Sequence, residues 1–166
     1  LFDEETEKLC RELNLEIMMP TAQLRREIDD KINSTRIANK AGVASVPNIL
    51  ASIKSYKELQ EKTKSLGPSV VIQTQYGDSG DTTYFVSNEQ EWDLCAKEIV
   101  SQKEVKVMKR IRCFPTAVEA CITRSGVIVG PMMSEIVGFP ELTPRKGGWA
   151  GNEISSELFD DTLRSK

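Results

Sequence analysis

The chain has 166 residues, of which 39% are hydrophobic and 28% charged, and its net charge is −3 at pH 7. This fits one globular domain or two small lobes that share a core, whereas a general nucleic-acid binder would show a basic excess and a membrane span would need about 18 consecutive apolar residues. The chain also has no histidine, the commonest general base and zinc ligand, and shows no secretory signal, so we expect a cytoplasmic location.

Helical patterns dominate the first quarter of the chain. Residues 3–14 have acids in their first turn and a short apolar face, which predicts a helix. Residues 15–19 are mostly apolar and stop at Pro20, which predicts a short strand. Residues 21–41 repeat apolar side chains at three- or four-residue spacing and end before Gly42, which predicts a second helix with a glycine at its C-terminal cap.

Two shorter helices are indicated by their caps. Ser55 and Glu58 have the spacing of a capping box, which predicts a helix over about 56–65. Asn88 is a favourable N-cap residue and precedes a segment with scattered apolar side chains, which predicts a helix over about 89–101.

The segment between these helices has the pattern of a β-hairpin. β-Branched and aromatic residues at 70–72 and 82–86 flank a loop with the sequence Gly77-Asp78-Ser79-Gly80. Glycines let backbone N–H groups approach a ligand closely, and consecutive N–H groups can bind an anion. The loop can therefore be interpreted as a phosphate-covering hairpin. It can equally be an ordinary surface turn, because these residue types are also the commonest in turns.

Strand patterns dominate the C-terminal half. Residues 105–111, 117–123 and 126–136 read as strands, the last two as a second hairpin. Residues 138–153 are rich in Gly, Pro and charge and are expected to form a loop, and 154–166 are expected to be helical. The sequence therefore predicts an α+β fold with a small antiparallel sheet and helices packed on one face.

Three separated segments add a more specific indication. They are Asp30-Lys31-Ile32 followed by Lys40-Ala41-Gly42-Val43 and Val46-Pro47, the strand–loop–strand at 70–86, and Val107-Met108-Lys109-Arg110-Ile111. In this order they resemble the ATP-grasp family, most closely its biotin-carboxylase-like branch. The resemblance covers roughly residues 20–136.

The resemblance implies that the chain is a fragment of an ATP-grasp fold. Residues 1–66 would be a helical segment of the A-lobe, 67–137 the lid or B-lobe, and 138–166 a loop-rich tail from a truncated A-lobe. Such enzymes bind ATP and form an acyl-phosphate, which is carboxyphosphate in the carboxylases. The expected function is thus the ATP-binding portion of an ATP-dependent ligase or carboxylase, not catalytically complete alone.

The resemblance also assigns roles to individual residues. Lys31 would contact the nucleotide phosphates as a point charge. The phosphate lid would be formed by Gly77, Asp78, Ser79, Gly80, Asp81 and Thr82. Lys109 and the backbone of Arg110 and Ile111 would lie along the adenine edge.

Three departures from the family pattern bear on this assignment. The strand before the lid usually ends in a lysine that reaches the phosphates, and here that position is Gln73, whose amide can donate hydrogen bonds but carries no charge. Met108 stands where relatives often place an acid beside the adenine. The Glu-x-Asn pair that binds Mg²⁺ in the family is missing, so the ligands of the expected Mg²⁺ would lie outside this chain and no metal ligand is assigned within it.

Other functions stay open at this point. The partners implied are a nucleotide and, through the missing lobes, a small carboxylate or bicarbonate substrate, with no nucleic acid and no membrane; the oligomeric state is not indicated. Whether the chain acts as an enzyme is also left open. The alternative is a non-catalytic ATP-grasp-like binding or regulatory domain, for which Gln73 is the motivating residue. A third interpretation is a protein-interaction module built around Trp149.

Overall fold

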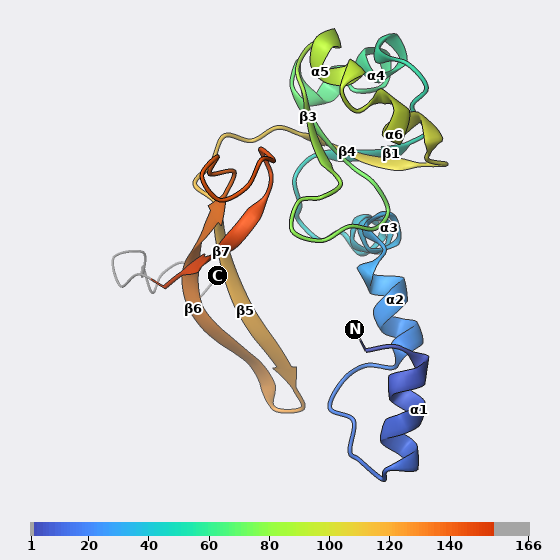
Figure 1. Ribbon diagram of the computed structural model, residues 1–166, viewed down its shortest axis with the longest axis vertical. Helices are drawn as coiled ribbons and strands as arrows, with labels where there is room; N and C mark the ends of the chain where they lie inside the picture. Colours follow the sequence, from blue (N-terminus) through green and yellow to red (C-terminus); the bar gives the residue numbers. More distant parts are fainter. Residues whose placement is uncertain (1, 155–166) are drawn as a thin grey trace. The chain divides into compact units, whose positions relative to one another are not determined.

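The computed structural model describes residues 2–154, which form two compact units (Figure 1). Among these residues, unit 1 comprises 2–77 together with Thr82–Arg110, and unit 2 comprises Asp78–Asp81 together with 111–154. Each unit is described by itself. None of the described helices has the length and apolarity needed to cross a lipid bilayer.

Unit 1 begins with a pair of helices. The predicted helix 3–14 is confirmed as α1 (Glu4–Glu12), and it contacts α2 (Ala22–Asp29), where the Ala22 N–H donates to Glu7 Oε2 at 3.0 Å. The strand predicted for 15–19 is wrong. This segment is a mostly exposed connection between the two helices, and it pairs with none of the described strands. An apolar run therefore does not form a strand unless a neighbouring strand is there to hydrogen-bond with it.

The single helix predicted for 21–41 is interrupted at Asp30. Asp30 leaves the helical conformation (φ −65°, ψ 104°) and becomes the N-cap of α3 (Lys31–Ala41), its carboxylate accepting the N–H groups of Ile32 and Asn33 at 2.9 and 3.0 Å. The predicted C-terminal cap is confirmed, because Gly42 is left-handed with φ 71°. The apolar periodicity continues across the interruption and for this reason predicted one helix. Asp30, a favourable N-cap residue, marks the start of the second helix.

The centre of unit 1 is a four-stranded antiparallel sheet in the order β1-β4-β2-β3. Its strands are β1 (Asn48–Ala51), β4 (Val105–Lys109), β2 (Val70–Gln73) and β3 (Thr83–Val86). The predicted hairpin is confirmed by the direct pairing of β2 with β3.

Three helices cover one face of this sheet (Figure 1). They are α4 (Tyr56–Lys62), which continues into the 3₁₀ turn η1 (Lys64–Leu66), and the pair α5 (Glu89–Asp93) and α6 (Ala96–Ser101), into which the predicted helix 89–101 divides. The core between helices and sheet consists of side chains that are almost completely buried, among them Ile53, Leu59, Ile72, Val86, Ile99, Val105 and Val107. The helices on one face are as predicted.

The other face of the sheet carries the alternate residues of each strand. Lys106, Met108, Val71 and Gln73 are only half buried there, because successive side chains of a strand point to opposite faces. Helix α3 contacts β4. This face therefore combines polar and apolar side chains and lacks the close cover given by α4, α5 and α6.

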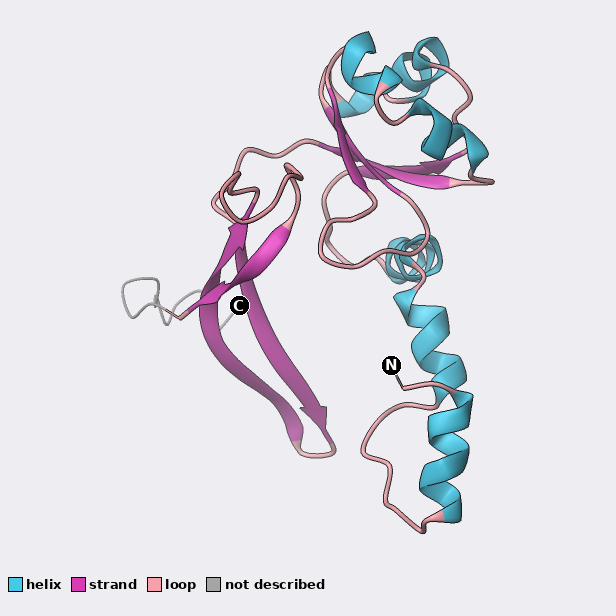
Figure 2. Cartoon of the chain, viewed as in Figure 1, coloured by secondary structure: helices cyan, strands magenta, loops and turns pink. Residues whose placement is uncertain are grey.

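Unit 2 contains a second antiparallel sheet, of three strands; strands are magenta in Figure 2. The predicted hairpin is confirmed as β5 (Thr116–Thr123) and β6 (Gly126–Val137). The loop predicted for 138–153 is only partly correct, since β7 (Trp149–Glu153) pairs with the end of β6. The segment is rich in glycine and charge, so its sequence does not show the pattern of a strand. It forms a strand because it pairs with β6. The helix predicted for 154–166 lies outside the described residues from position 155 onward.

These two units do not coincide with the predicted segments 1–66, 67–137 and 138–166. β1, from the first predicted segment, pairs with β4 from the second, while β5 and β6 belong to a different sheet, in which β6 pairs with β7 from the third. Strand pairing is non-local, and the linear order of the elements does not reveal it. The assignment of these segments to A- and B-lobes stays a prediction.

A matched pair of leucine substitutions tests the core of unit 1. Leu59→Ala removes a side chain that is 2% exposed and should lower the free energy of unfolding by about 2–5 kcal/mol, through lost burial and the cavity left behind. Leu94→Ala, at a position 88% exposed, should change it by no more than about 0.5 kcal/mol. Equilibrium denaturation by urea measures both, and equal effects would contradict this core.

The Asp30 cap should also appear in the pH dependence of stability. Burial alone would raise the pKa of Asp30, but hydrogen bonds from Asn33, Gln75 and Ile32 and the charge of Arg36 together hold this pKa below its ordinary value. The carboxylate therefore stabilises the fold above the ordinary pKa of about 3.9, and this contribution is lost as the pH falls through the lowered pKa.

Asp30→Asn keeps a capping side chain but removes its charge. We expect this variant to be less stable than the unsubstituted chain by roughly 0.3–1 kcal/mol at neutral pH, since a charge at the N-terminus of a helix is worth that much. The difference should close as the pH falls below about 4. Urea denaturation at several pH values measures it, and a difference that does not vary with pH would contradict the role of the charge.

Candidate functional site

Lys31 joins the start of α3 to the loop that follows β2. Its backbone N–H donates to the Gln75 carbonyl at 2.9 Å, and its side-chain Nζ donates to the carbonyl of Gly77. As the first residue of α3, Lys31 places a cation at the positive end of the helix dipole, and the first turn contains no acid. A cation at this end is unfavourable for the helix dipole, and the Asp30 carboxylate beside it and the Gly77 carbonyl offset part of this cost.

A hydrogen bond between the side chains of Asp30 and Gln75 also holds this junction together. The Gln75 amide nitrogen donates to Asp30 Oδ2 at 2.7 Å, while the other carboxylate oxygen of Asp30 caps α3. One carboxylate thus fixes both the start of the helix and the strand-to-loop segment. As a result, the predicted phosphate cation Lys31 lies at the base of the predicted phosphate-binding loop.

Gln73 lies on the half-buried face of the sheet, between two neighbouring strands. Its amide nitrogen donates to the Thr83 hydroxyl at 3.1 Å on β3, and on the other side its Cα partner on β4 is Lys106. Burial, together with the nearby charge of Lys31, lowers the pKa of Lys106. We did not predict a role for Lys106. The signal was present in the alternation Val-Lys-Val-Met-Lys, in which this lysine points to the other face of the sheet from the two core valines.

The base of the predicted lid loop is closed by Gly77 and Thr82. The Thr82 hydroxyl donates to the Tyr76 carbonyl at 2.9 Å, and the Thr74 N–H donates to the Thr82 carbonyl at 3.3 Å. A Cβ at Gly77 would collide with the Thr82 side chain, and Gly77 has φ 146°. Only glycine fits this close approach.

The tip of the loop, Asp78–Asp81, is held within unit 2. Asp81 forms an ion pair with Arg145, and the Ser79 carbonyl accepts the N–H of Trp149 at 3.2 Å. Gly80 has φ 82°, and a Cβ there would collide with the Gly147 backbone. The tip is therefore a specifically packed turn, and its action as a phosphate lid stays a prediction.

Trp149, the aromatic residue of the third interpretation, is the first residue of β7. Its ring N–H donates to Asn152 Oδ1 at 3.0 Å, and its side chain is 45% exposed. The half-exposed ring is compatible with a contact surface, but this indole N–H already has a partner.

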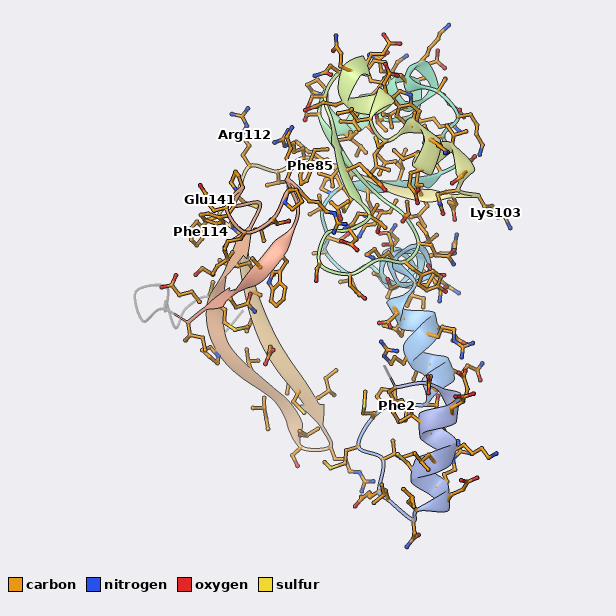
Figure 3. The ribbon with its side chains drawn as sticks, in the orientation of Figure 1. Phe2, Phe85, Lys103, Arg112, Phe114 and Glu141 are labelled. Atoms are coloured by element: carbon orange, nitrogen blue, oxygen red, sulfur yellow. The ribbon has the colours of Figure 1, made fainter. Side chains whose placement is uncertain are left out.

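The predicted adenine-edge residues stand at the end of β4. The N–H of Lys109 donates to the Pro47 carbonyl at 2.9 Å and that of Arg110 to the Ser69 carbonyl at 3.2 Å, while Ile111 already belongs to unit 2. The Arg110 guanidinium lies 5.2 Å from the centre of the Phe85 ring, a cation–π contact; Phe85 is labelled in Figure 3. Because these two N–H groups are engaged, an adenine contact here would have to use other backbone groups.

Two hollows of unit 1 lie elsewhere. One, of about 370 Å³, is lined by residues of α4, η1 and the ends of β2 and β3, and the other, of about 460 Å³, lies between Tyr84 and α6. Neither includes a predicted site residue. The candidate site is instead the half-buried face of the sheet with the α3–loop junction.

The described residues do not fit a magnesium site of their own. No three carboxylate, histidine or cysteine side chains among residues 2–154 are grouped so that they could hold a metal ion. Asp30 is engaged in capping and Asp81 with Arg145. We therefore derive no step through a metal, and the location of the Mg²⁺ ligands outside this chain stays a prediction.

Comparison by sequence identifies no relative, since no protein-family model and no curated protein matches the chain. Comparison of the fold does. D-alanyl-alanine synthetase A from Vibrio cholerae O1 biovar eltor superposes with a TM-score of 0.66 over 97% of this chain and 50% of its own, at 10% identity.

Two further structures give the same result. They are N5-carboxyaminoimidazole synthetase from Staphylococcus aureus with ADP (TM-score 0.65, 16% identity, 97% of this chain and 40% of that one) and the Aspergillus clavatus synthase with ADP and 5-aminoimidazole ribonucleotide (TM-score 0.66, 13% identity, 99% and 42%). The chain thus spans half or less of the length of these three proteins. Its fold is that of part of the ATP-grasp ligases, as the resemblance in its sequence predicted.

Proposed function

We propose that this chain is the ATP-binding portion of an ATP-dependent ligase that forms an acyl-phosphate. The observation that carries the proposal is the placement of Lys31, which the start of α3 brings to the base of the Gly-rich hairpin loop. The fold supports it, because an Aspergillus clavatus synthase of similar fold was crystallised with ATP (TM-score 0.60, 17% identity) and the Staphylococcus aureus synthetase with ADP.

The residues of the junction suit phosphoryl transfer, which depends mainly on positioning and charge neutralisation. Lys31 would act as a point charge on the phosphates, with Asp30 and Gln75 holding its backbone in place. Gly77, Asp78, Ser79, Gly80, Asp81 and Thr82 would cover the phosphates and exclude water, so that the acyl-phosphate survives. Lys109, Arg110 and Ile111 would border the adenine.

The finer parts of the function are proposals of the same kind. A carboxyphosphate intermediate, a bicarbonate or small carboxylate substrate, and the biotin-carboxylase-like branch all follow from the resemblance in the sequence. The Mg²⁺ ligands and the substrate site would be supplied by parts of the fold outside this chain. We therefore expect this chain to bind nucleotide without completing the reaction alone.

The alternative is a non-catalytic binding or regulatory domain with the same fold. It is favoured by Gln73, which has lost the charge expected at the end of β2 and instead bonds to Thr83. In that case a nucleotide would bind weakly or not at all. The two functions differ in whether ATP binding depends on Lys31.

Thermal unfolding of the full chain, with and without millimolar ATP and Mg²⁺, tests the proposal. A ligand that binds only the folded state at a hundredfold excess over its Kd adds about 2.7 kcal/mol, which raises the melting temperature of a chain of this size by several degrees. Lys31→Ala should lose most of this increase, because a charged contact to phosphate is removed.

Lys8→Ala is the matched control. Lys8 lies on α1 with a side chain that is 77% exposed, and its i,i+4 pair with Glu12 contributes little. This variant should keep the full increase. An ATP-dependent increase that survives Lys31→Ala would contradict the proposed site, and no increase at all would favour the non-catalytic alternative.

A further inference from the structure

The half-buried face of the unit 1 sheet contains one row of side chains that crosses all four strands. The strand registers place Leu50, Lys106, Gln73 and Thr83 side by side in this row. Directly opposed residues of antiparallel strands have Cβ atoms only about 4.5–5.5 Å apart and point to the same face. Lys106 is therefore the immediate neighbour of the position at which the charge is missing.

Lys106 also shares its surroundings with Lys31. Burial, and after it the charge of Lys31, lower the pKa of Lys106. Helix α3, which begins with Lys31, contacts β4, which carries Lys106. Two cations from different elements thus converge beside the end of β2.

The nearby carboxylates of Asp30 and Glu104 form no ion pair with either lysine. Asp30 accepts three hydrogen bonds, from Ile32, Asn33 and Gln75, and Glu104 forms an ion pair with Arg36 at 2.6 Å. Within residues 2–154 no ion pair joins Lys31 or Lys106 to an acid. Two like charges that are partly buried and unpaired favour a polyvalent anion between them.

We propose that Lys106 supplies the phosphate-binding charge that Gln73 lacks, so that Lys31 and Lys106 together bind the phosphate groups of the nucleotide. The proposal rests on the proposed function. A lysine side chain has four flexible methylene groups, so an ammonium group that starts one strand away can reach the same point. The Gln73 amide nitrogen meanwhile donates to the Thr83 hydroxyl on the other neighbouring strand.

Calorimetric titration of the full chain with ATP and, separately, with inorganic tripolyphosphate tests this. Lys106→Gln should weaken the binding of both ligands about tenfold or more, as expected for a lost charge-assisted contact. Lys103→Gln removes the same charge from an exposed position three residues away, labelled in Figure 3, and should leave both affinities within about twofold.

The decisive variant moves the charge back by one strand. Gln73→Lys combined with Lys106→Gln should restore affinity to within about threefold of the unsubstituted chain, because the ammonium group again lies beside Lys31. If Lys106 served only to cover Leu50 and its neighbours, the exchange would not rescue binding. Lys106→Arg keeps the charge and provides a readout even if Lys106→Gln does not fold.

The outcomes separate this inference from the proposed function. ATP binding that is lost in Lys31→Ala but unchanged in Lys106→Gln would overturn the role of Lys106 and leave the nucleotide site standing. Binding of tripolyphosphate that depends on Lys106, without binding of ATP, would support the lysine pair and overturn the nucleotide function. Binding of neither ligand would overturn both.

Discussion

The junction between α3 and the loop after β2 is the constraint on which the candidate site depends. Asp30 ends α2, and its carboxylate caps the start of α3 and accepts the Gln75 amide N–H. Because of this junction, Lys31 lies at the positive end of α3 and beside Gly77. Helix capping and the proposed nucleotide binding thus depend on neighbouring residues of one junction.

The sheet of unit 1 divides its two faces between the core and the candidate site. One face packs Ile72, Val107 and their neighbours against α4, α5 and α6 and forms the core. The other face keeps Gln73, Lys106 and Met108 half exposed. Successive side chains of a strand point to opposite faces, and this alternation allows the division. Substitutions on the half-buried face therefore need not disturb the core. A phosphate-binding charge can therefore move from one strand to the next without a change of fold.

Several features of the fold could be predicted because their causes are local. The hairpin at 70–86, the caps at Ser55 and Asn88 and the left-handed Gly42 each follow from a residue and its near neighbours. The predicted strand at 15–19 and the unbroken helix over 21–41 were wrong, and the loop predicted over 138–153 was only partly correct. The outcome depended, in that order, on a neighbouring strand to pair with, on the capping carboxylate of Asp30 and on the pairing of β7 with β6.

The sequence by itself determined the class of the fold, the Asp30-Lys31 motif and the Gly-rich hairpin, because helix caps, turns and strand alternation act within a few residues. Only the tertiary structure decided the strand order β1-β4-β2-β3, the placement of the loop tip in unit 2 and the position of Lys106 opposite Gln73. These depend on register between segments that are far apart in the chain. That register is set by burying one complete face of the sheet, and no local pattern encodes it.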